Sequence, residues 1–350
     1  MQNKNNKMKL LVPLVSVFLG LLIGGIIMLV SGYRPIEAYV ALFQGMLGGP
    51  YYIGETIRQM SPLILSGLAV AFAFRTGLFN IGVEGQLLVG WLAAVYVGVT
   101  VDAPAIIHIP LAILAAAVAG ALWGAVPGIL KARFKVHEVI TTIMMNYIAL
   151  YTTNEIIRNF LLAPGERTEN VKESASLASP FLQSITEYST LHYGIIVALI
   201  AAVIMWFLLW RTTMGYELRA VGFNQHASQY AGINVSKNIV LSMAISGAFA
   251  GIAGSMEGLG TYQYMTINAA FTGVGFDGIA VALLGANSAI GVVLGAVLFG
   301  GLKIGALNMQ SIAGVPTELV GVVIALIIFF VACSYIVHWL MNRVSKGGKI

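Results

Sequence analysis

The stretch NIVLSMAISGAFAGIAGSMEGL, residues 238–259, decides the class of fold, because it is almost wholly apolar and long enough to cross a bilayer. A helix needs about 20 mostly apolar residues for that crossing. The whole chain has the same character: 58% of its 350 residues are hydrophobic and 9% are charged, with a mean hydropathy of +0.87. Soluble domains carry about 25% charged residues. The composition therefore indicates an all-α polytopic membrane protein.

Similar apolar stretches recur on both sides of this one, and together they predict about ten transmembrane helices. With the N-terminus in the cytoplasm, an even number of crossings places both termini there. The second, third and eighth spans have indistinct ends in the sequence. The predicted spans are residues 11–30, 56–74, 85–101, 105–130, 139–161, 193–210, 238–259, 278–284 with its flanks, 289–307 and 317–340.

The basic residues agree with this layout, because most of the 19 lysines and arginines fall on its cytoplasmic side. Such a bias is what the positive-inside rule expects. Lys303 lies within a span. The basic residues on the external side are Arg34, Arg58, Arg158, Arg167 and Lys172.

Composition also limits the chemistry that the chain can perform. The lone cysteine, Cys333, has no partner for an intrachain disulfide or a Cys-rich metal site, and it is expected to be a buried apolar side chain. The five histidines show no metal-ligand spacing, and no catalytic triad is apparent. The net charge of +5 reflects the sorting of charge across a bilayer, so no nucleic-acid partner is expected. We expect one transmembrane domain over residues 1–350 and no enzyme activity.

Two polar segments interrupt the apolar stretches. Residues 163–190 read as an external loop, solvated or in contact with an external partner. Residues 211–237, RTTMGYELRAVGFNQHASQYAGINVSK, are cytoplasmic in this layout. There Asn224 is a suitable N-cap and Gly232 a suitable C′ residue, which predicts a two-turn helix over residues 225–231. So short a helix needs packing to be stable. The alternative is an ordinary capped turn between two spans.

Glycines cluster around polar residues at two further places, RTGLFNIGVEGQLL and NAAFTGVGFDGIAVALL. Irregular backbone at membrane depth is tolerated where it is buried in protein or lines a cavity, and Gly-interrupted segments in both halves of a transporter point to its site. The alternative at the first place is a plain turn, with Asn80 and Glu84 capping the next helix. Intramembrane ionisable residues are usually functional. The candidate pathway residues are Asn80, Glu84, Gln86, Asn146, Glu257 and Asp277; Asn146 equally suits a bond between helices.

Three stretches resemble one family of proteins. LRAVGFNQHASQYAGI is similar to the cytoplasmic loop of ABC-importer permeases that serve sugars, nucleosides and branched-chain amino acids. GLFNIGVEGQ resembles a signature of the nucleoside and simple-sugar branch, and GFDGIAVALLGANSAIGVVLGAVLFG resembles the family's late helix pair. The similarity runs in matching order from about residue 61 to 307. It is strongest to the nucleoside-uptake permeases of Gram-positive bacteria.

The resemblance implies that residues 211–237 are a coupling segment whose short helix sits in a groove of a cytoplasmic ABC ATPase subunit. The chain itself has no Gly-x-x-x-x-Gly-Lys-Ser/Thr string to hold nucleotide phosphates, so no cofactor is expected in it, and ATP and Mg²⁺ would be bound by the ATPase. The implied ATPase contacts are Arg219, Asn224, Gln225, His226, Tyr230 and Ala231. The other implied partners are a second permease subunit, an extracytoplasmic solute-binding lipoprotein and the lipid bilayer of a bacterial plasma membrane.

The function expected from this resemblance is import of a nucleoside such as guanosine. A simple sugar is the second choice and a branched-chain amino acid the third. A rival of another class is a proton-coupled secondary transporter that uses Glu84 or Asp277. That rival needs carboxylates deep in the membrane and gives the 211–237 segment no role.

Overall fold

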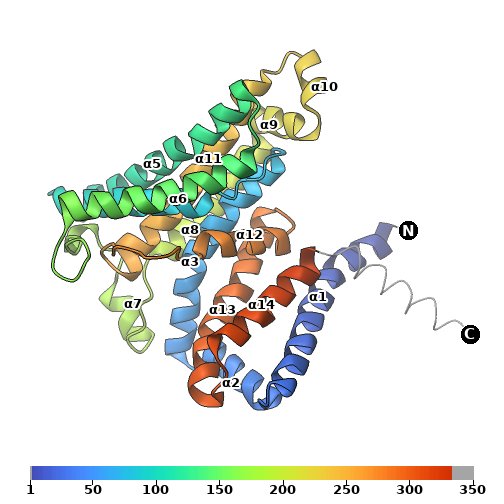
Figure 1. Cartoon of the computed structure of the whole chain (residues 1–350), viewed down its shortest axis with the longest axis vertical. Helices are drawn as coiled ribbons and strands as arrows, with labels where there is room; N and C mark the ends of the chain where they lie inside the picture. The colour runs from blue at the N-terminus through green and yellow to red at the C-terminus, as the bar shows by residue number, and fades with distance from the viewer. Residues whose placement is uncertain (1, 333–350) are drawn as a thin grey trace, which may run out of the picture. The chain divides into compact units, whose positions relative to one another are not determined.

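The computed structural model of the chain describes residues 2–332, and within them it is almost entirely helical, which confirms the all-α class (Figure 1). Contacts group the chain into two compact units. Unit 1 comprises Met1–Ile53 with Gly301–Ile350, and unit 2 is Gly54–Gly300. Two helices, α3 (Pro50–Arg75) and α13 (Ala289–Ala313), contribute residues to both units.

In unit 1, α1 (Gln2–Val30) packs against α14 (Thr317–Ala332) through small residues. A Cβ added at Gly20 would lie 2.5 Å from the Ile327 side chain, so the two helices approach closely there. The sequence did not predict α2 (Pro35–Leu47), which begins with a proline at its first turn. The Asn308 amide of α13 donates to the carbonyl of Ala41 at 2.7 Å and ties that helix to α2.

The last predicted span, residues 317–340, is described only as far as the end of α14. Its remainder, and the expectation of a buried Cys333, lie outside the described residues. Glu318 lies in the first turn of α14, where a carboxylate interacts favourably with the helix dipole.

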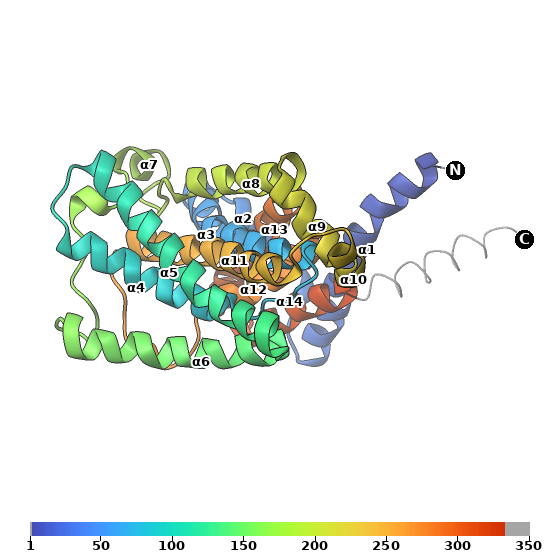
Figure 2. The ribbon, with the colours of Figure 1, turned by 90° about the horizontal axis from the view of Figure 1, so that it is seen from above.

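Unit 2 is built around three helices, α4 (Val83–Thr100), α5 (Ala105–Phe134) and α11 (Val235–Met256), which pack on one another (Figure 2). Around them lie the remaining elements of the unit. These are α6 (Glu138–Ile156), the π-helix η1 (Ile157–Leu161), the 3₁₀ turn η2 (Glu173–Ala175), α7 (Pro180–Ile185), α8 (Gly194–Arg211), α9 (Thr213–Phe223), α10 (Gln225–Tyr230), the π-helix η3 (Glu257–Thr261) and α12 (Val274–Leu284).

Glycines set the spacing between the three central helices. A Cβ at Gly90 of α4 would lie 2.3 Å from Gly251 Cα of α11, and one at Gly120 of α5 would lie 2.2 Å from the carbonyl oxygen of Gly247. Neither position has room for a side chain. In membranes, packing of this kind replaces the hydrophobic drive between helices, because lipid tails are as apolar as leucine. This close packing of glycines holds α4 in place, and the candidate site lies at the N-terminus of α4.

Six helices in the described part of the chain are long and apolar enough to span a membrane. They are Pro50–Arg75, Val83–Thr100, Ala105–Phe134, Gly194–Arg211, Val235–Thr261 and Ala289–Ala313. The predicted eighth span corresponds to α12, which has 11 residues and a length of about 16 Å. A bilayer core is about 30 Å thick, so α12 cannot cross it alone. The sequence therefore located the helix, but α12 by itself is not one of the spanning helices that the count of ten assumed.

The loop predicted over residues 163–190 is ordered by backbone pairing. Isolated bridges join Ala163 to Arg167 and Arg167 to Thr266, and Thr168 N–H donates to the Met265 carbonyl at 2.9 Å. The loop also contains η2 and the short helix α7, which Ser179 caps. Residues 163–171 are therefore tied to the irregular chain that follows η3.

Candidate transport site and the 211–237 segment

The turn between α3 and α4 is a buried polar network around Asn80. The Asn80 side-chain amide donates to Gln86 Oε1 at 2.9 Å and to Ser246 Oγ at 2.8 Å, while its Oδ1 accepts the Gly82 N–H at 2.9 Å. Ser246 Oγ in turn donates to the Ala69 carbonyl at 2.6 Å. Asn80 and Ser246 are 0% exposed, and Gln86 is 1% exposed. Buried polar groups are stable only when paired in this way. The network therefore fixes the entry of the chain into α4.

Glycine is required in this turn for two reasons. Gly77 has a φ of +74°, a left-handed conformation that side chains disfavour. A Cβ there would also lie 2.7 Å from Gly222 Cα of α9. The preceding Arg75 donates from Nε to the Asn287 carbonyl at 2.7 Å and from Nη2 to the Ala286 carbonyl at 3.0 Å. The turn thus contacts both α9 and the connection between α12 and α13.

Glu84 joins the first turn of α4 to the start of α12, and we call Glu84, Thr272, Gly273 and Gly275 the Glu84 clamp. One carboxylate oxygen accepts the Thr272 hydroxyl at 2.7 Å and the Gly273 N–H at 2.9 Å. The other accepts the Gly275 N–H at 2.7 Å. Glu84 is 0% exposed. A helix N-terminus has unsatisfied N–H groups and a partial positive charge, so a carboxylate is its natural partner.

Asn146 of α6 performs a similar task at the start of α4. Its Oδ1 accepts the Gly85 N–H at 2.8 Å, and its Nδ2 donates to the Ile81 carbonyl at 3.0 Å. The bond between helices expected of Asn146 is therefore present. Two N-termini of interrupted helices, those of α4 and α12, meet side by side, each satisfied by a side chain from another element.

Of the other two candidate pathway residues, Asp277 lies on the same helix turn that Glu84 contacts, whereas Glu257 lies at the end of α11. Asp277 lies in the first turn of α12, two residues beyond Gly275, and is partly exposed. Glu257 begins the π-helix η3 and is 4% exposed. π-helical turns are rare and often occur at functional sites.

Sequence reasoning missed two contributors to the network, Ser246 and Thr272. Ser246 lies within an apolar span, where a single serine gives no signal of its role. Thr272 directly precedes Gly273, so the glycine cluster of the second break pointed to its neighbourhood. Gly273 adopts a φ of +82° at the N-cap of α12, which explains the glycine there.

The 211–237 segment folds as the sequence predicts, with one addition. The two-turn helix is α10, whose N-cap Asn224 accepts the Ala227 N–H at 3.0 Å. Gly232 follows it with a φ of +83°, and its N–H donates to the Gln229 carbonyl at 3.0 Å. The addition is α9, which Thr212 caps by accepting the Gly215 N–H at 3.0 Å.

Most side chains of α10 are exposed. Tyr230 is 95% exposed, and Phe223 at the end of α9 is 90% exposed. Among the residues of α10, Ser228 alone is buried. The residues Gln225, His226 and Ala231 are also exposed. Arg219 differs, because its guanidinium lies 4.1 Å from the Trp210 ring centroid and the residue is partly buried.

A groove of about 500 Å³ lies beside α10. Its lining comes from the end of α5, from α10 and from the start of α11, and it includes Lys131, Lys135, Gln225, Gln229 and Ser236. Lys131 Nζ is 2.5 Å from Glu138 Oε2 and forms an ion pair with it. Ala132, Ile233, Val235 and Ile239 also line it, so the groove is of mixed polarity and runs beside an exposed helix.

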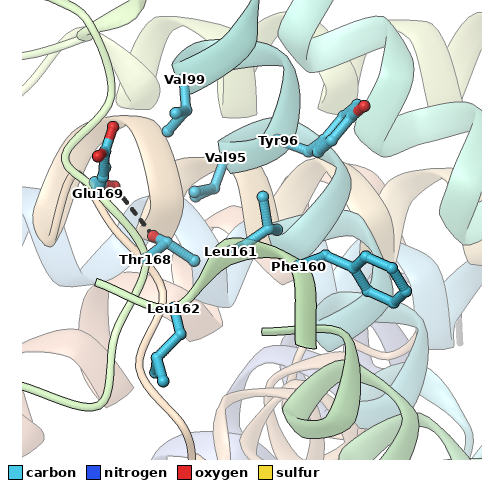
Figure 3. Close-up of a pocket in the computed structure, with 8 residues that line it drawn as sticks. All are labelled: Val95, Tyr96, Val99, Phe160, Leu161, Leu162, Thr168 and Glu169. Carbon is cyan, nitrogen blue, oxygen red and sulfur yellow. Dashed lines mark hydrogen bonds between the residues drawn. The ribbon is translucent and has the colours of Figure 1, made fainter. Parts of the chain in front are cut away.

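A second cavity, of about 260 Å³, lies between α4 and the chain that follows α6 (Figure 3). Val95, Tyr96 and Val99 line it from α4, and Phe160 and Leu161 from η1, with Thr168 and Glu169 on the loop side. In Figure 3 the Thr168 hydroxyl donates to the carbonyl of Glu169, at 3.0 Å.

A buried histidine stands in the loop before α8. His192 is 0% exposed, and its Nδ1 accepts the Gly194 N–H at 3.0 Å. Burial first, and the positive charge of Arg58 second, lower the pKa of His192 from 6.5 to about 4. Arg58 pairs with Glu55 at 3.0 Å, and Glu55 also accepts the Thr190 N–H at 2.6 Å.

These features define a class of protein: a polytopic helical membrane protein with two interrupted helices whose N-termini meet in a buried polar site. A family model described as "Branched-chain amino acid transport system / permease component" matches residues 52–349. The chain therefore belongs to this family of ABC-importer permeases, which are multi-pass membrane proteins of bacteria and act as non-catalytic transport subunits.

Several individual proteins are similar to the chain. It is 67% identical, over 97% of each chain, to the guanosine ABC transporter permease protein NupP of Bacillus subtilis. It is 44% identical to the nucleoside ABC transporter permease protein NupB of Lactococcus lactis, over 97% of this chain and 95% of that one. A more distant relative, the guanosine permease NupQ of B. subtilis, is 31% identical over 71% of this chain and 79% of its own length. No solved structure matches the chain significantly.

Proposed function

We propose that this chain is a membrane subunit of an ATP-driven importer that carries guanosine or a closely related nucleoside. The observation that carries the proposal is the 67% identity to a guanosine permease over 97% of both chains. Similarity that extends over whole chains covers the pathway as well as the scaffold. The second relative, at 44% identity, is named for nucleosides in general, which supports the same class of solute.

In this proposal both termini are cytoplasmic, about ten segments cross the bilayer, and residues 1–350 act as one transmembrane domain. Residues 163–190 face the outside, where a solute-binding lipoprotein delivers the nucleoside. Residues 211–237 face the cytoplasm. The distribution of lysines and arginines supports this orientation.

The ATPase partner would dock on α10. The exposure of Tyr230, Gln225, His226 and Ala231 supports this, because a two-turn helix with one buried residue has little to hold it in isolation. The Asn224 side chain shapes the helix by capping it, and Arg219 fixes the base of the segment on Trp210. ATP and Mg²⁺ would be bound by that partner.

A second permease subunit would complete the pathway. The B. subtilis relatives support a heteromeric arrangement, since two different chains of that organism are both named guanosine permeases. Asn80, Glu84, Gln86 and Asn146 would hold the α4 and α12 N-termini at the pathway wall, with Asp277 on the first turn of α12 and Glu257 at the start of η3 as its further polar residues. The buried carboxylate of Glu84 is engaged by three donors, which suits a structural anchor of that wall.

A simple sugar is the second candidate solute. It is favoured by a 34% identity to a glucose ABC transporter permease protein, TsgB13 of Haloferax volcanii, over 92% of this chain and 87% of that one. The lower identity makes it the weaker candidate. Proton-coupled transport has no support, because the chain belongs to a family of ABC permeases.

The test is uptake of radiolabelled guanosine and ribose by cells with and without the gene, in ATP-replete cells treated with a protonophore. We expect gene-dependent guanosine uptake that persists when the proton gradient collapses. Uptake that disappears with the gradient would contradict ATP-driven import. Gene-dependent ribose uptake without guanosine uptake would leave the ATP-driven machinery in place and replace the nucleoside with a sugar.

A further inference from the structure

The outward face of α6 differs in chemistry from those of its neighbours. Its exposed residues include Met144, Tyr147 and Tyr151, which are 56%, 47% and 67% exposed. Figure 2 shows α6 along the outside of the unit 2 helices. The exposed large residues of α5 between its ends are aliphatic: Leu111, Leu114, Val118, Leu122 and Val126.

The position of the two tyrosines argues against a lipid-facing surface. Helical chain continues from Glu138 through η1 to Leu161, so Tyr147 and Tyr151 lie near its middle. Tyrosines that face lipid gather at the two membrane interfaces, where water reaches the hydroxyl. Within the hydrocarbon region a phenolic hydroxyl needs a polar partner that lipid does not supply. A surface in contact with water supplies such a partner for the tyrosine hydroxyls.

Tyr147 also belongs to an aromatic cluster drawn from three elements of unit 2. Its ring centroid lies 5.0 Å from that of Phe271, at an interplanar angle of 68°. Phe271 lies 5.7 Å from Phe276 of α12, at 88°. Phe276 is 37% exposed, so the cluster opens outward on the same side as Tyr147.

The cluster is held firmly in place on both sides of Phe271. Asn154 of α6 pairs with the backbone of Asn268, accepting its N–H at 3.0 Å and donating to its carbonyl at 2.8 Å. On the other side, Thr272 and Gly273 bond directly to Glu84. The three rings are therefore continuous with the Glu84 clamp, at the N-terminus of the half-length helix α12.

We propose that Tyr147, Phe271 and Phe276 form a surface on which the nucleobase of the transported nucleoside stacks as it passes along α6. Every base has a flat π-face, so stacking on aromatic side chains accepts many bases without hydrogen-bond readout. That property suits a wall that must hold a solute briefly and release it. The inference rests on the proposed nucleoside function and assigns the residues that would meet its solute.

Accessibility to a water-soluble thiol reagent tests the surface directly. In a Cys333→Ser background, Tyr147→Cys or Phe276→Cys would be exposed to a positively charged methanethiosulfonate in membrane vesicles that contain the whole transporter. The matched control is Leu122→Cys on α5, which is 67% exposed and lies on the aliphatic face of that helix. We expect labelling at positions 147 and 276 but not at 122, and slower labelling while guanosine and ATP are present.

Two outcomes of this experiment would overturn the inference. Positions 147 and 276 that react no faster than position 122 would mean that the cluster faces lipid. A position 147 that is inaccessible but cross-links to the second permease subunit would make the face a subunit interface. The Cys333→Ser parent separates the two levels of the argument, because its guanosine uptake tests the proposed function independently of the labelling.

Guanosine uptake by variants of Tyr147 provides a second test of the proposed surface. Tyr147→Ala should lower the rate of guanosine uptake about ten-fold, because it removes one stacking face, whereas Tyr147→Phe should stay near the parent rate. Co-purification of the ATPase should be unchanged in both. Full guanosine uptake by Tyr147→Ala would contradict the proposal.

Discussion

The Glu84 clamp and α10 are built from the same kinds of residue, yet the structure treats them in opposite ways. Each has a glycine with positive φ, Gly273 at the start of α12 and Gly232 after the end of α10; Asn224 caps α10 locally, whereas the N-terminus of α12 is satisfied by Glu84 from another helix. In the clamp, Glu84 and Gly275 are buried, and three donors bond to the Glu84 carboxylate within the chain. In contrast, α10 buries a single residue. The comparison shows that a capping motif in the sequence predicts where a helix begins. Whether that helix end bonds within the chain or stays exposed for a partner depends on how deeply the tertiary structure buries it.

The strongest test of the buried side of this comparison is Glu84→Ala. The change leaves the buried Gly275 N–H without its acceptor, at a cost of about 1–3 kcal/mol for an orphaned buried donor, and it also removes the bonds to the more exposed Gly273 N–H and Thr272 hydroxyl. We expect a loss of about 3 kcal/mol or more in stability, measured as a lower unfolding temperature in detergent. Glu84→Gln keeps one acceptor oxygen and should lose less, with assembly intact and transport impaired. An unchanged unfolding temperature for Glu84→Ala would contradict the clamp.

The two regions can be compared directly through one glycine from each, Gly275→Ala and Gly232→Ala. A Cβ at Gly275 would lie 2.5 Å from Glu84 N, so a backbone must move, at a cost of about 2–3 kcal/mol. A Cβ at Gly232 meets no atom within 4 Å and adds only the strain of its φ of +83°, about 1 kcal/mol. We expect Gly275→Ala to lower the thermal unfolding temperature more than Gly232→Ala does. Equal losses would mean that conformation, and not packing, limits both sites.

The buried side chain of His192 makes the stability of the protein depend on pH. Because burial lowers the pKa of His192 from 6.5 to about 4, the unfolded chain binds more protons between these values than the folded chain does. This contribution to stability is present above pH 6.5 and is lost as the pH falls toward 4. Protonation would also remove the acceptor at Nδ1 for the Gly194 N–H.

Lowering the pH from 6.5 to about 5 should therefore cost about 2 kcal/mol, seen as a fall in unfolding temperature. His192→Gln provides the control, because it keeps a polar side chain but does not titrate. If the variant and the parent lose stability equally over this range, another group is responsible.

The smallest effect on stability is expected at α10. Tyr230→Asp and Ala231→Asp replace exposed residues, and surface changes usually alter stability by less than about 0.5 kcal/mol. The ATPase, however, should no longer co-purify, because a charge would replace the apolar docking surface. Phe181→Asp changes another exposed aromatic residue, in α7, and is the control that should leave the ATPase bound. Intact assembly in the Tyr230→Asp variant would contradict docking on α10.

Much of the fold was predictable from local signals. The apolar stretches located the long helices, Asn224 and Gly232 marked α10, and glycine clusters marked both interrupted helices. Two helices escaped prediction, α2 and α9, because each is short and next to a long apolar stretch. The orientation of the chain and the roles of the candidate pathway residues remain predictions.

The sequence by itself determined that the chain is a membrane protein, where its helices break and which family it resembles, since these depend on local composition and on short motifs. The tertiary structure alone decided what the polar residues bind. Glu84 was expected either to line the pathway or to favour the N-terminus of its own helix, and the structure adds that it satisfies the N-terminus of α12, bonding to Thr272 from 188 residues away along the chain. The role of Ser246 could not be predicted from the sequence, because its hydrogen bond to Asn80 joins two helices whose packing no local pattern encodes.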